Sequence, residues 1–236
     1  MKTQAIVPMA GTGARFQASL PIVINIPKTL MRINGKPLFV HALEALQASA
    51  LIDNIILVVP AAYCDEFKDF AREYQLTKVS QVIAGGVTRA DSVFHGLRQL
   101  ADDTDLVLIH DGVRPLITVE LIERAVALGK KYPAVITAVP VKPTIKQVDK
   151  QNMLVQQTLD RDALWEVQTP QVFRKEIILK AHEQFGKKSQ ATDDAMLVEQ
   201  LGIPVKVLKG DYRNVKVTTQ EDLIFVEALL SMKEAK

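Results

Sequence analysis

Residues that could hold a phosphate chain follow the first predicted strand. The sequence there reads Pro8-Met-Ala-Gly-Thr-Gly-Ala-Arg15, and Pro27-Lys28 comes soon after. Glycine lets backbone N–H groups approach phosphate oxygens because no Cβ stands in the way. An ordinary strand–helix turn would explain the glycines alone. Arg15 and Lys28 add the positive charge that a triphosphate needs, and they favour phosphate binding.

The spacing of these glycines disfavours two common nucleotide folds. A dinucleotide-binding fingerprint needs a third glycine, and that position is Phe16. The second strand ends in Val58-Val-Pro60, with no acid placed for a ribose. The P-loop pattern is also missing from the sequence. An oxidoreductase that uses a nicotinamide cofactor is therefore disfavoured.

A second glycine pair ends the third predicted strand, in Gly85-Gly-Val-Thr-Arg-Ala-Asp-Ser92. Thr88 is placed to cap the following helix. Arg89 and Ser92 fall in its first turns, where free N–H groups and the helix dipole favour anions. Ser92 would hydrogen-bond a base or a phosphate, whereas capping alone would explain Asp91.

A carboxylate and a guanidinium follow the fourth predicted strand, in His110-Asp-Gly-Val-Arg-Pro115. A carboxylate at the carboxyl edge of a parallel sheet commonly holds Mg²⁺ together with substrate phosphates. Arg114 would clamp a second anionic group. The alternative is a local ion pair between Asp111 and Arg114. His110 is expected to be a packed or orienting side chain.

Further polar residues are scattered over the C-terminal half, and each has a plain structural explanation by itself. Spacing alone does not establish that they converge. These residues are Thr144, Arg161, Thr169, Thr192 and Lys216.

The alternation of elements predicts an α/β fold. Apolar runs of strand length alternate with helical patterns, which is typical of a parallel sheet with helices on both faces. The predicted strands span Ala5–Pro8, Asn54–Val59, Val79–Ala84, Leu106–His110, Ala134–Val139, Val205–Leu208 and Asn214–Val217. The predicted helices span Pro37–Ala48, Tyr63–Tyr74, Thr88–Leu100, Val119–Lys130, Lys175–Gln184, Asp193–Gln200 and Thr219–Met232.

Residues 140–160 interrupt this regularity. Apolar and polar residues alternate over Thr144–Leu159 around a turn at Asp149-Lys-Gln-Asn152, which predicts a projecting β-hairpin. A two-stranded ribbon is marginal in water by itself and needs a surface to cover it. That surface is either a second subunit or the hairpin's own domain. We expect a single domain over residues 1–236, with residues 140–160 as a β-arm within it.

Composition narrows the possible partners and compartment. The formal net charge is +2, which gives no sign of a nucleic-acid or membrane surface. Cys64 is the only cysteine, so a disulfide framework is excluded and a reducing compartment is indicated. The sequence begins Met1-Lys-Thr-Gln and enters a strand without a signal sequence. We expect a cytoplasmic protein that binds neither nucleic acid nor membranes.

Taken together, these motifs resemble the 2-C-methyl-D-erythritol 4-phosphate cytidylyltransferases of the non-mevalonate isoprenoid pathway. The resemblance runs nearly end to end and is more specific than any one motif. It rests on Pro8-Met-Ala-Gly-Thr-Gly-Ala-Arg15, Pro27-Lys28, Gly85-Gly-Val-Thr-Arg-Ala-Asp-Ser-Val93, His110-Asp-Gly-Val-Arg-Pro115, Asp160-Arg161, Gln168-Thr-Pro-Gln171, Thr192-Asp-Asp194 and Asn214-Val-Lys-Val-Thr218.

The resemblance implies a Rossmann-like nucleotidyltransferase fold, a mostly parallel twisted sheet and a homodimer joined through the β-arm. It implies that CTP and a sugar-alcohol phosphate react with the help of Mg²⁺ or another divalent cation. Catalytic roles are implied for Arg15, Lys28 and Lys216. Nucleotide contacts are implied for Pro8, Ala10, Gly11, Thr12, Gly13, Gly86, Arg89 and Ser92. Substrate contacts are implied for Asp111, Arg114, Thr144, Arg161, Thr169 and Thr192, with Asp111 also as the metal ligand.

Two features depart from the family. The segment Phe16–Ile26 is longer than is usual there, and Val87 stands where a polar residue is common. A ribitol 5-phosphate cytidylyltransferase is the nearest alternative, with Arg161 favouring the methylerythritol enzyme. A glycosyltransferase that uses Asp103-Thr-Asp105 is disfavoured, because this motif precedes its strand instead of following it. A nucleotide-binding regulator without activity would not need so many basic groups.

Overall fold

A computed structural model describes residues 1–236 except 12, 20–25, 187–190 and 235–236. Within this part, seven strands form one sheet in the order β11-β7-β10-β6-β1-β4-β5. Every pair is parallel except the two that involve β10. The strands are β11 (Lys206–Lys209), β7 (Ala134–Pro140), β10 (Trp165–Arg174), β6 (Thr104–Ile109), β1 (Lys2–Pro8), β4 (Asn54–Val59) and β5 (Val79–Ala84).

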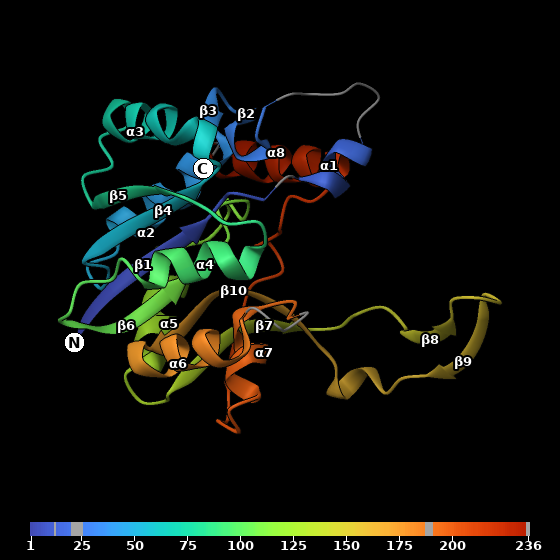
Figure 1. The fold of residues 1–236 in the computed structure, drawn as a ribbon. Coiled ribbons are helices and arrows are strands. Elements are labelled where there is room, and N and C mark those ends of the chain that lie inside the picture. Colours follow the sequence, from blue (N-terminus) through green and yellow to red (C-terminus); the bar gives the residue numbers. More distant parts are fainter. Residues whose placement is uncertain (12, 20–25, 187–190, 235–236) are drawn as a thin grey trace.

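Helices cover both faces of this sheet (Figure 1). Their positions agree with the sequence predictions to within a few residues. They are α2 (Leu38–Ala48), α3 (Cys64–Glu73), α4 (Arg89–Leu97), α5 (Val119–Gly129), α6 (Lys175–Phe185), α7 (Asp194–Glu199) and α8 (Gln220–Glu234). The shorter elements are α1 (Ala14–Ala18), β2 (Arg32–Ile33) and β3 (Lys36–Pro37).

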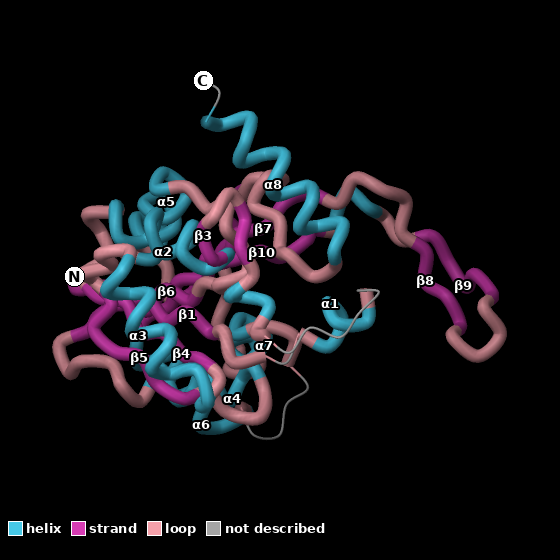
Figure 2. The backbone as a smooth tube through the Cα atoms, turned by 90° about the horizontal axis from the view of Figure 1, so that it is seen from above, coloured by secondary structure: helices cyan, strands magenta, loops and turns pink. Residues whose placement is uncertain are grey.

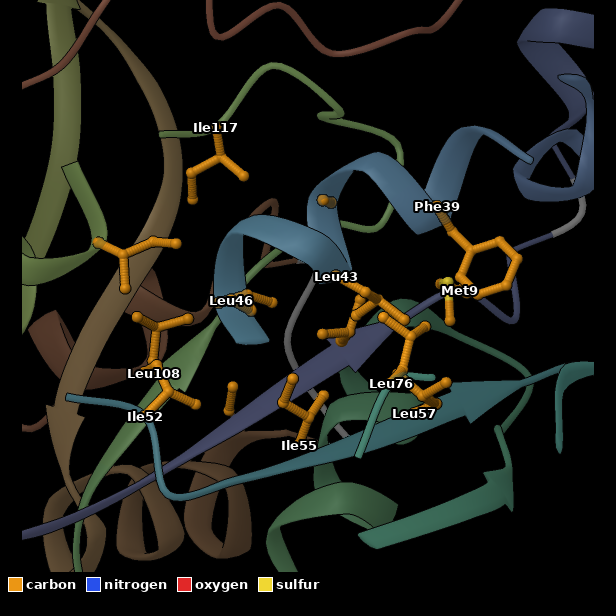
Figure 3. Packing of buried hydrophobic residues seen from close by; sticks show 14 of the residues in the cluster. Met9, Phe39, Leu43, Leu46, Ile52, Ile55, Leu57, Leu76, Leu108 and Ile117 are labelled. Carbon is orange, nitrogen blue, oxygen red and sulfur yellow. The ribbon is translucent and has the colours of Figure 1, made fainter. Parts of the chain in front are cut away.

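Alternating strand residues build two separate hydrophobic layers. Ala5 and Val7 of β1 face the layer that holds α2, α3 and α5, whereas Ile6 faces α4, α6 and α7. Successive side chains of a strand point to opposite faces, so a strand covered on both sides must be apolar throughout. Figure 3 shows the first layer, where Phe39 and Leu43 of α2 pack over the sheet. These layers fix the strand ends that carry the polar motifs.

The strand β10 was not expected from the sequence. It contains Pro170 and several polar residues, and therefore it does not follow a strand pattern. The chain leaves β7 at Pro140, passes through the β-arm and returns beside β7, so β10 must run antiparallel to it. A register shift between Gln168 and Gln171 lets the proline sit within the sheet.

The segment Asn214–Val217 is a loop, which corrects the predicted strand there. Side chains take the place of a ladder of backbone hydrogen bonds. Asn214 donates from Nδ2 to the carbonyl of Thr169 at 2.7 Å, and Arg114 donates to the carbonyl of Asn214 at 2.7 Å. Val217 then packs with Val226 of α8. This loop brings Lys216 back toward the sheet.

The β-arm consists of β8 (Lys146–Asp149) and β9 (Leu154–Thr158), and it projects away from the body of the subunit (Figures 1 and 2). The hairpin is thus not folded onto its own domain. Its apolar residues face solvent in the single chain, with Met153 76%, Leu154 65% and Val155 59% exposed.

Candidate functional site

A cavity of about 330 Å³ opens at the carboxyl ends of β1 and β6. Parallel strands meet at this edge of the sheet, which explains why separate motifs converge there. Nine of the residues singled out in the sequence line it, and we call it the nucleotide pocket. They are Pro8, Ala10, Gly11, Gly13, Lys28, Arg89, Ser92, Asp111 and Lys216. Thr12 and the side chain of Arg15 lie outside the described residues.

Gly85 lets two loops beside the nucleotide pocket come into contact, whereas Gly86 lies against Asp91 at the start of its own helix. A Cβ on Gly85 would lie 2.2 Å from the Cβ of Ala10, and one on Gly86 would lie 2.4 Å from the Cβ of Asp91. The Gly86 N–H donates to Ser92 Oγ at 3.1 Å, and that hydroxyl donates to the Thr88 carbonyl at 2.9 Å. Thr88 caps α4 in a capping box with Asp91, as the sequence predicted for Thr88.

Lys28 begins a short turn (Lys28–Leu30) and donates from Nζ to the Val217 carbonyl at 2.6 Å. This bond joins the turn at Lys28 to the loop that carries Lys216. The Lys28 ammonium also lies 5.6 Å from the centre of the buried Phe16 ring. Lys28 and Lys216 therefore enter one pocket from opposite ends of the chain.

Asp111 is held between two cations. Its Oδ1 accepts hydrogen bonds from Arg89 Nε at 3.2 Å and Nη2 at 3.1 Å, and its Oδ2 accepts one from Lys216 Nζ at 2.6 Å. Burial alone would raise the pKa of Asp111, but Arg89 and Lys216 outweigh burial and hold this pKa well below its usual range. The carboxylate is therefore ionised.

The alternative of an ion pair between Asp111 and Arg114 is wrong. Arg114 is buried and donates to two backbone carbonyls, those of Asn214 and Val167. Its Nε has no hydrogen-bond partner in the described part of the chain. Arg114 thus supports the loop before Lys216 while it also lines a second cavity.

His110 and Thr169 fix the backbone at Asp111. Burial lowers the pKa of His110 to about 4, so the imidazole is neutral. His110 Nε2 lies 3.2 Å from the Arg114 carbonyl, which only accepts, so this nitrogen carries the proton. His110 Nδ1 then accepts from the Thr169 hydroxyl at 3.0 Å, and that hydroxyl accepts from the Asp111 N–H at 3.1 Å. His110 is an orienting side chain, as expected.

A second cavity of about 370 Å³ adjoins the nucleotide pocket, and we call it the acceptor pocket. Arg114, Thr169 and Thr192, three of the residues for which the resemblance implies substrate contacts, line it. The two pockets share Arg89, Asp111 and Lys216 as lining residues. A charged boundary thus separates two places for anionic ligands.

Three other predicted residues line neither pocket, and the first of them, Gly86, lies beside Ser92 in the loop before α4. Thr144 and Arg161 lie at the base of the β-arm and line neither pocket of the chain. Arg161 is exposed and donates to the Lys142 carbonyl at 3.1 Å.

Asp194 was missed as a member of the site. It is buried, and its Oδ2 accepts from Arg89 Nη1 at 2.7 Å. Asp194 belongs to the motif Thr192-Asp-Asp194, one of those that carry the family resemblance. Asp194 and Arg89 are far apart in the sequence, so the sequence gave no sign that they form an ion pair. Only the packing of α7 beside α4 and α6 brings the two together.

Other candidate positions carry no comparable chemistry. Asp103 and Asp105 bind Lys2 at the amino end of β1, on the opposite edge of the sheet, which agrees with the rejection of a glycosyltransferase. A larger cavity of about 690 Å³ lies between α3 and β5 and contains none of the predicted residues. Among the described residues, no three His, Cys, Asp or Glu side chains form a metal-binding group. None of the described helices has the length and apolar character needed to span a membrane.

Comparison with known proteins finds a family model and relatives that match nearly the whole chain. The sequence model of the 2-C-methyl-D-erythritol 4-phosphate cytidylyltransferase family matches residues 3–232. The chain is 42% identical to the protein of that name from Syntrophus aciditrophicus, over 100% of this chain and 98% of the relative. It is also 42% identical to the one from Geobacillus thermodenitrificans, over the whole of both chains.

Solved structures of the same kind share the fold. The 4-diphosphocytidyl-2C-methyl-D-erythritol synthase of Anaerococcus prevotii superposes with a TM-score of 0.82 at 35% identity, covering 98% of both chains. The cytidylyltransferase of Thermus thermophilus superposes with a TM-score of 0.78 at 26% identity, covering 98% of this chain and 100% of the other.

Proposed function

Because the chain belongs to the 2-C-methyl-D-erythritol 4-phosphate cytidylyltransferase family, we propose that its two adjoining pockets hold CTP and the sugar-alcohol phosphate side by side. The enzyme transfers the cytidylyl group of CTP to 2-C-methyl-D-erythritol 4-phosphate, a step of the non-mevalonate isoprenoid pathway. The relatives give no support to the ribitol alternative. The observation that carries the proposal is the shared boundary of Arg89, Asp111 and Lys216.

The reaction needs placement more than proton transfer. An oxygen of the acceptor phosphate attacks the α-phosphorus of CTP, the bond from that phosphorus to the bridging oxygen breaks, and pyrophosphate leaves with the electron pair. A phosphate monoester is already a competent nucleophile, so a strong base is unnecessary. The main barrier is the approach of two polyanions, which positioned cations lower.

Lys28 and Lys216 are suited to this task because both line the nucleotide pocket. Lys28 would stabilise charge on the bridging and leaving oxygens, and Lys216 would assist at the α-phosphate beside the acceptor pocket. Arg15 would share the charge of the triphosphate. Gly11 and Gly13 leave room for the phosphate chain next to the backbone.

Asp111 fits a divalent cation that also binds substrate phosphates. Mg²⁺ in phosphate-transfer sites uses one or two carboxylates, with phosphate oxygens and water as its other ligands. Asp111 is ionised, and its Oδ2 accepts one hydrogen bond, from Lys216, which leaves this oxygen a second lone pair for a metal ion. When bound, Mg²⁺ would neutralise charge on the triphosphate and on the leaving pyrophosphate.

The β-arm is proposed to join two subunits into a homodimer. Its exposed Met153, Leu154 and Val155 form an apolar surface that a partner would cover. A partner subunit would then receive Thr144 and Arg161 in its acceptor pocket, where Arg161 would bind the acceptor phosphate. We place the enzyme in the cytoplasm, where CTP is made and where Cys64 stays reduced.

Release of pyrophosphate tests the function directly. The purified chain is assayed with CTP, ATP, UTP and GTP, each with methylerythritol phosphate or ribitol phosphate and with Mg²⁺. We expect turnover with CTP and methylerythritol phosphate to exceed every other pair. A preference for ribitol phosphate, or for another nucleotide, would refute the assignment, and chelation of the metal with EDTA should abolish turnover.

A further inference from the structure

We propose that Asp194 is a positioning residue, which fixes Arg89 and through it the Asp111–Lys216 pair at the boundary of the two pockets. The inference rests on the proposed function of that boundary. Asp194 touches neither cavity and lies behind the site, in the first turn of α7. Its effect on the reaction would therefore pass through Arg89.

The connection is a continuous chain of charged contacts. Asp194 Oδ2 accepts from Arg89 Nη1 at 2.7 Å, and Arg89 binds Asp111 Oδ1 through Nε and Nη2. Asp111 Oδ2 then accepts from Lys216 Nζ at 2.6 Å. A guanidinium is planar, so carboxylates on two of its sides fix both its position and its plane. The Lys216 ammonium is thereby placed from the interior of the protein.

His182 contacts Asp194, the residue at the interior end of this series of charged contacts. The side chains of His182 and Asp194 are almost completely buried, and His182 Nε2 lies 3.1 Å from Asp194 Oδ1. The His182 ring stacks on Phe94 of α4, with a ring separation of 6.2 Å and an interplanar angle of 2°. Both oxygens of Asp194 therefore have partners, and the carboxylate is unable to rotate without losing one of them.

The charge of the buried Asp194 carboxylate indicates that this residue serves the site and does not merely fill space in the core. Burying an ionised carboxylate carries a desolvation cost, and apolar residues of similar volume commonly stabilise a core as well or better. The residues that follow Asp194 in α7, such as Ala195 and Leu197, belong to a buried apolar layer. Asp194 also balances charge, because Arg89 and Lys216 would otherwise share one carboxylate.

Asp194→Asn tests the inference, because asparagine keeps the shape and removes the charge. With CTP and methylerythritol phosphate, we expect kcat to fall about tenfold, the scale of losing a residue that orients a ligand-binding group. We expect the KM for CTP to change less than kcat, because the part of the lining away from Arg89, Asp111 and Lys216, which includes Gly11 and Lys28, stays in place. Asp53→Asn is the matched control, since Asp53 binds the Thr3 N–H at the opposite edge of the sheet. Its kcat should equal that of the wild type.

A double-mutant cycle separates positioning from general destabilisation. If Asp194 acts through Arg89, adding Asp194→Asn to Arg89→Lys should lower kcat less than twofold further, because interacting residues are not additive. Full additivity in kcat, or normal kcat for a folded Asp194→Asn variant, would overturn the inference. If that variant does not fold, His182→Phe, which removes the hydrogen bond to Asp194 Oδ1, replaces it in the same cycle, and the same outcomes apply. An inactive wild type would instead refute the proposed function.

Discussion

Lys28 and Lys216 show how single charges define the nucleotide pocket. Each ammonium already has a partner in this structure, the Val217 carbonyl for Lys28 and Asp111 for Lys216. A triphosphate offers stronger, charged acceptors, so both side chains can pass from internal partners to the ligand without leaving a buried charge unpaired. In the absence of ligand, the hydrogen bonds to the Val217 carbonyl and to Asp111 keep Lys28 and Lys216 near the positions where negative charge would develop in the reaction.

Lys28→Ala should lower kcat by roughly a hundred- to a thousandfold, on the scale of losing one donor that stabilises a transition state. Steady-state release of pyrophosphate at saturating substrates measures the effect. Lys2→Ala serves as the matched control, because Lys2 pairs with Asp103 at the far edge of the sheet. Near-normal kcat for Lys28→Ala would reject its catalytic role.

The buried imidazole of His110 makes stability depend on pH. Burial lowers its pKa from 6.5 to about 4, so the unfolded chain takes up the proton first as the pH falls. The contribution of neutral His110 is complete above pH 6.5 and is lost between pH 6.5 and 4, amounting to about 3 kcal/mol at most. Urea unfolding at several pH values measures this loss.

His110→Gln provides the comparison for this pH series. Its amide can donate to the Arg114 carbonyl and accept from Thr169, but it does not titrate. We expect the stability of the wild type to fall more steeply than that of the variant between pH 6.5 and 4. Parallel curves would show that His110 does not carry this pH dependence.

At the scale of elements, the nucleotide pocket depends on how closely two strand–helix loops approach. Gly85 lets the loop after β5 lie against Ala10 in the loop after β1, and the Thr88 capping box then starts α4 at a fixed point. Arg89 is the first residue of α4, so the Thr88 cap also fixes the backbone position from which the Arg89 side chain extends. The position of the Arg89 side chain thus depends on the contact between the two loops and on the cap of α4.

Gly85→Ala should separate these loops, because the added Cβ would meet Ala10 at 2.2 Å. We expect a destabilisation of about 1–3 kcal/mol, typical of overpacking, together with weaker binding of CTP. Thermal unfolding and calorimetric titration with CTP measure the two effects. Gly11→Ala is the control for stability, because its Cβ would meet nothing within 4 Å. Equal stability of both variants would contradict this account.

At the scale of the whole molecule, the β-arm carries two predicted site residues that line neither pocket of their own subunit. Thr144 and Arg161 lie at its base, and the hairpin extends away from the sheet (Figure 2). The arm is a direct continuation of β7 and β10, which flank the acceptor pocket through Ile136 and Thr169. Association through the arm would therefore act on the geometry of the site in both subunits.

Mixing two inactive variants tests whether Arg161 acts across the proposed dimer. In a mixed dimer of Lys28→Ala and Arg161→Ala subunits, one site keeps both residues if Arg161 serves the partner. Random exchange should then restore about a quarter of wild-type activity, because half of the dimers are mixed and each holds one intact site. Restoration should be absent if Arg161 serves its own subunit, and sedimentation should reveal a dimer at assay concentrations.

The sequence by itself determined the α/β class, the order of the helices and of the sheet strands other than β10, and most of the residues that gather in the nucleotide pocket. These features follow from local rules, since buried strands are apolar on both faces and parallel strands present their following residues at one edge. Apolar periodicity and glycine positions suffice to locate Pro8, Gly85 and Asp111 on that edge.

Only the tertiary structure decided which of these residues become partners. Asp111 binds Arg89 and Lys216 instead of the nearby Arg114, and Asp194 closes the chain of charges from behind. The strand β10 and the loop at Asn214 are likewise held by long-range contacts that local patterns do not encode. These ion pairs, and the position of β10 between β7 and β6, depend on how close segments that are remote in sequence come to one another. Tertiary packing sets those distances, and local sequence patterns do not encode them.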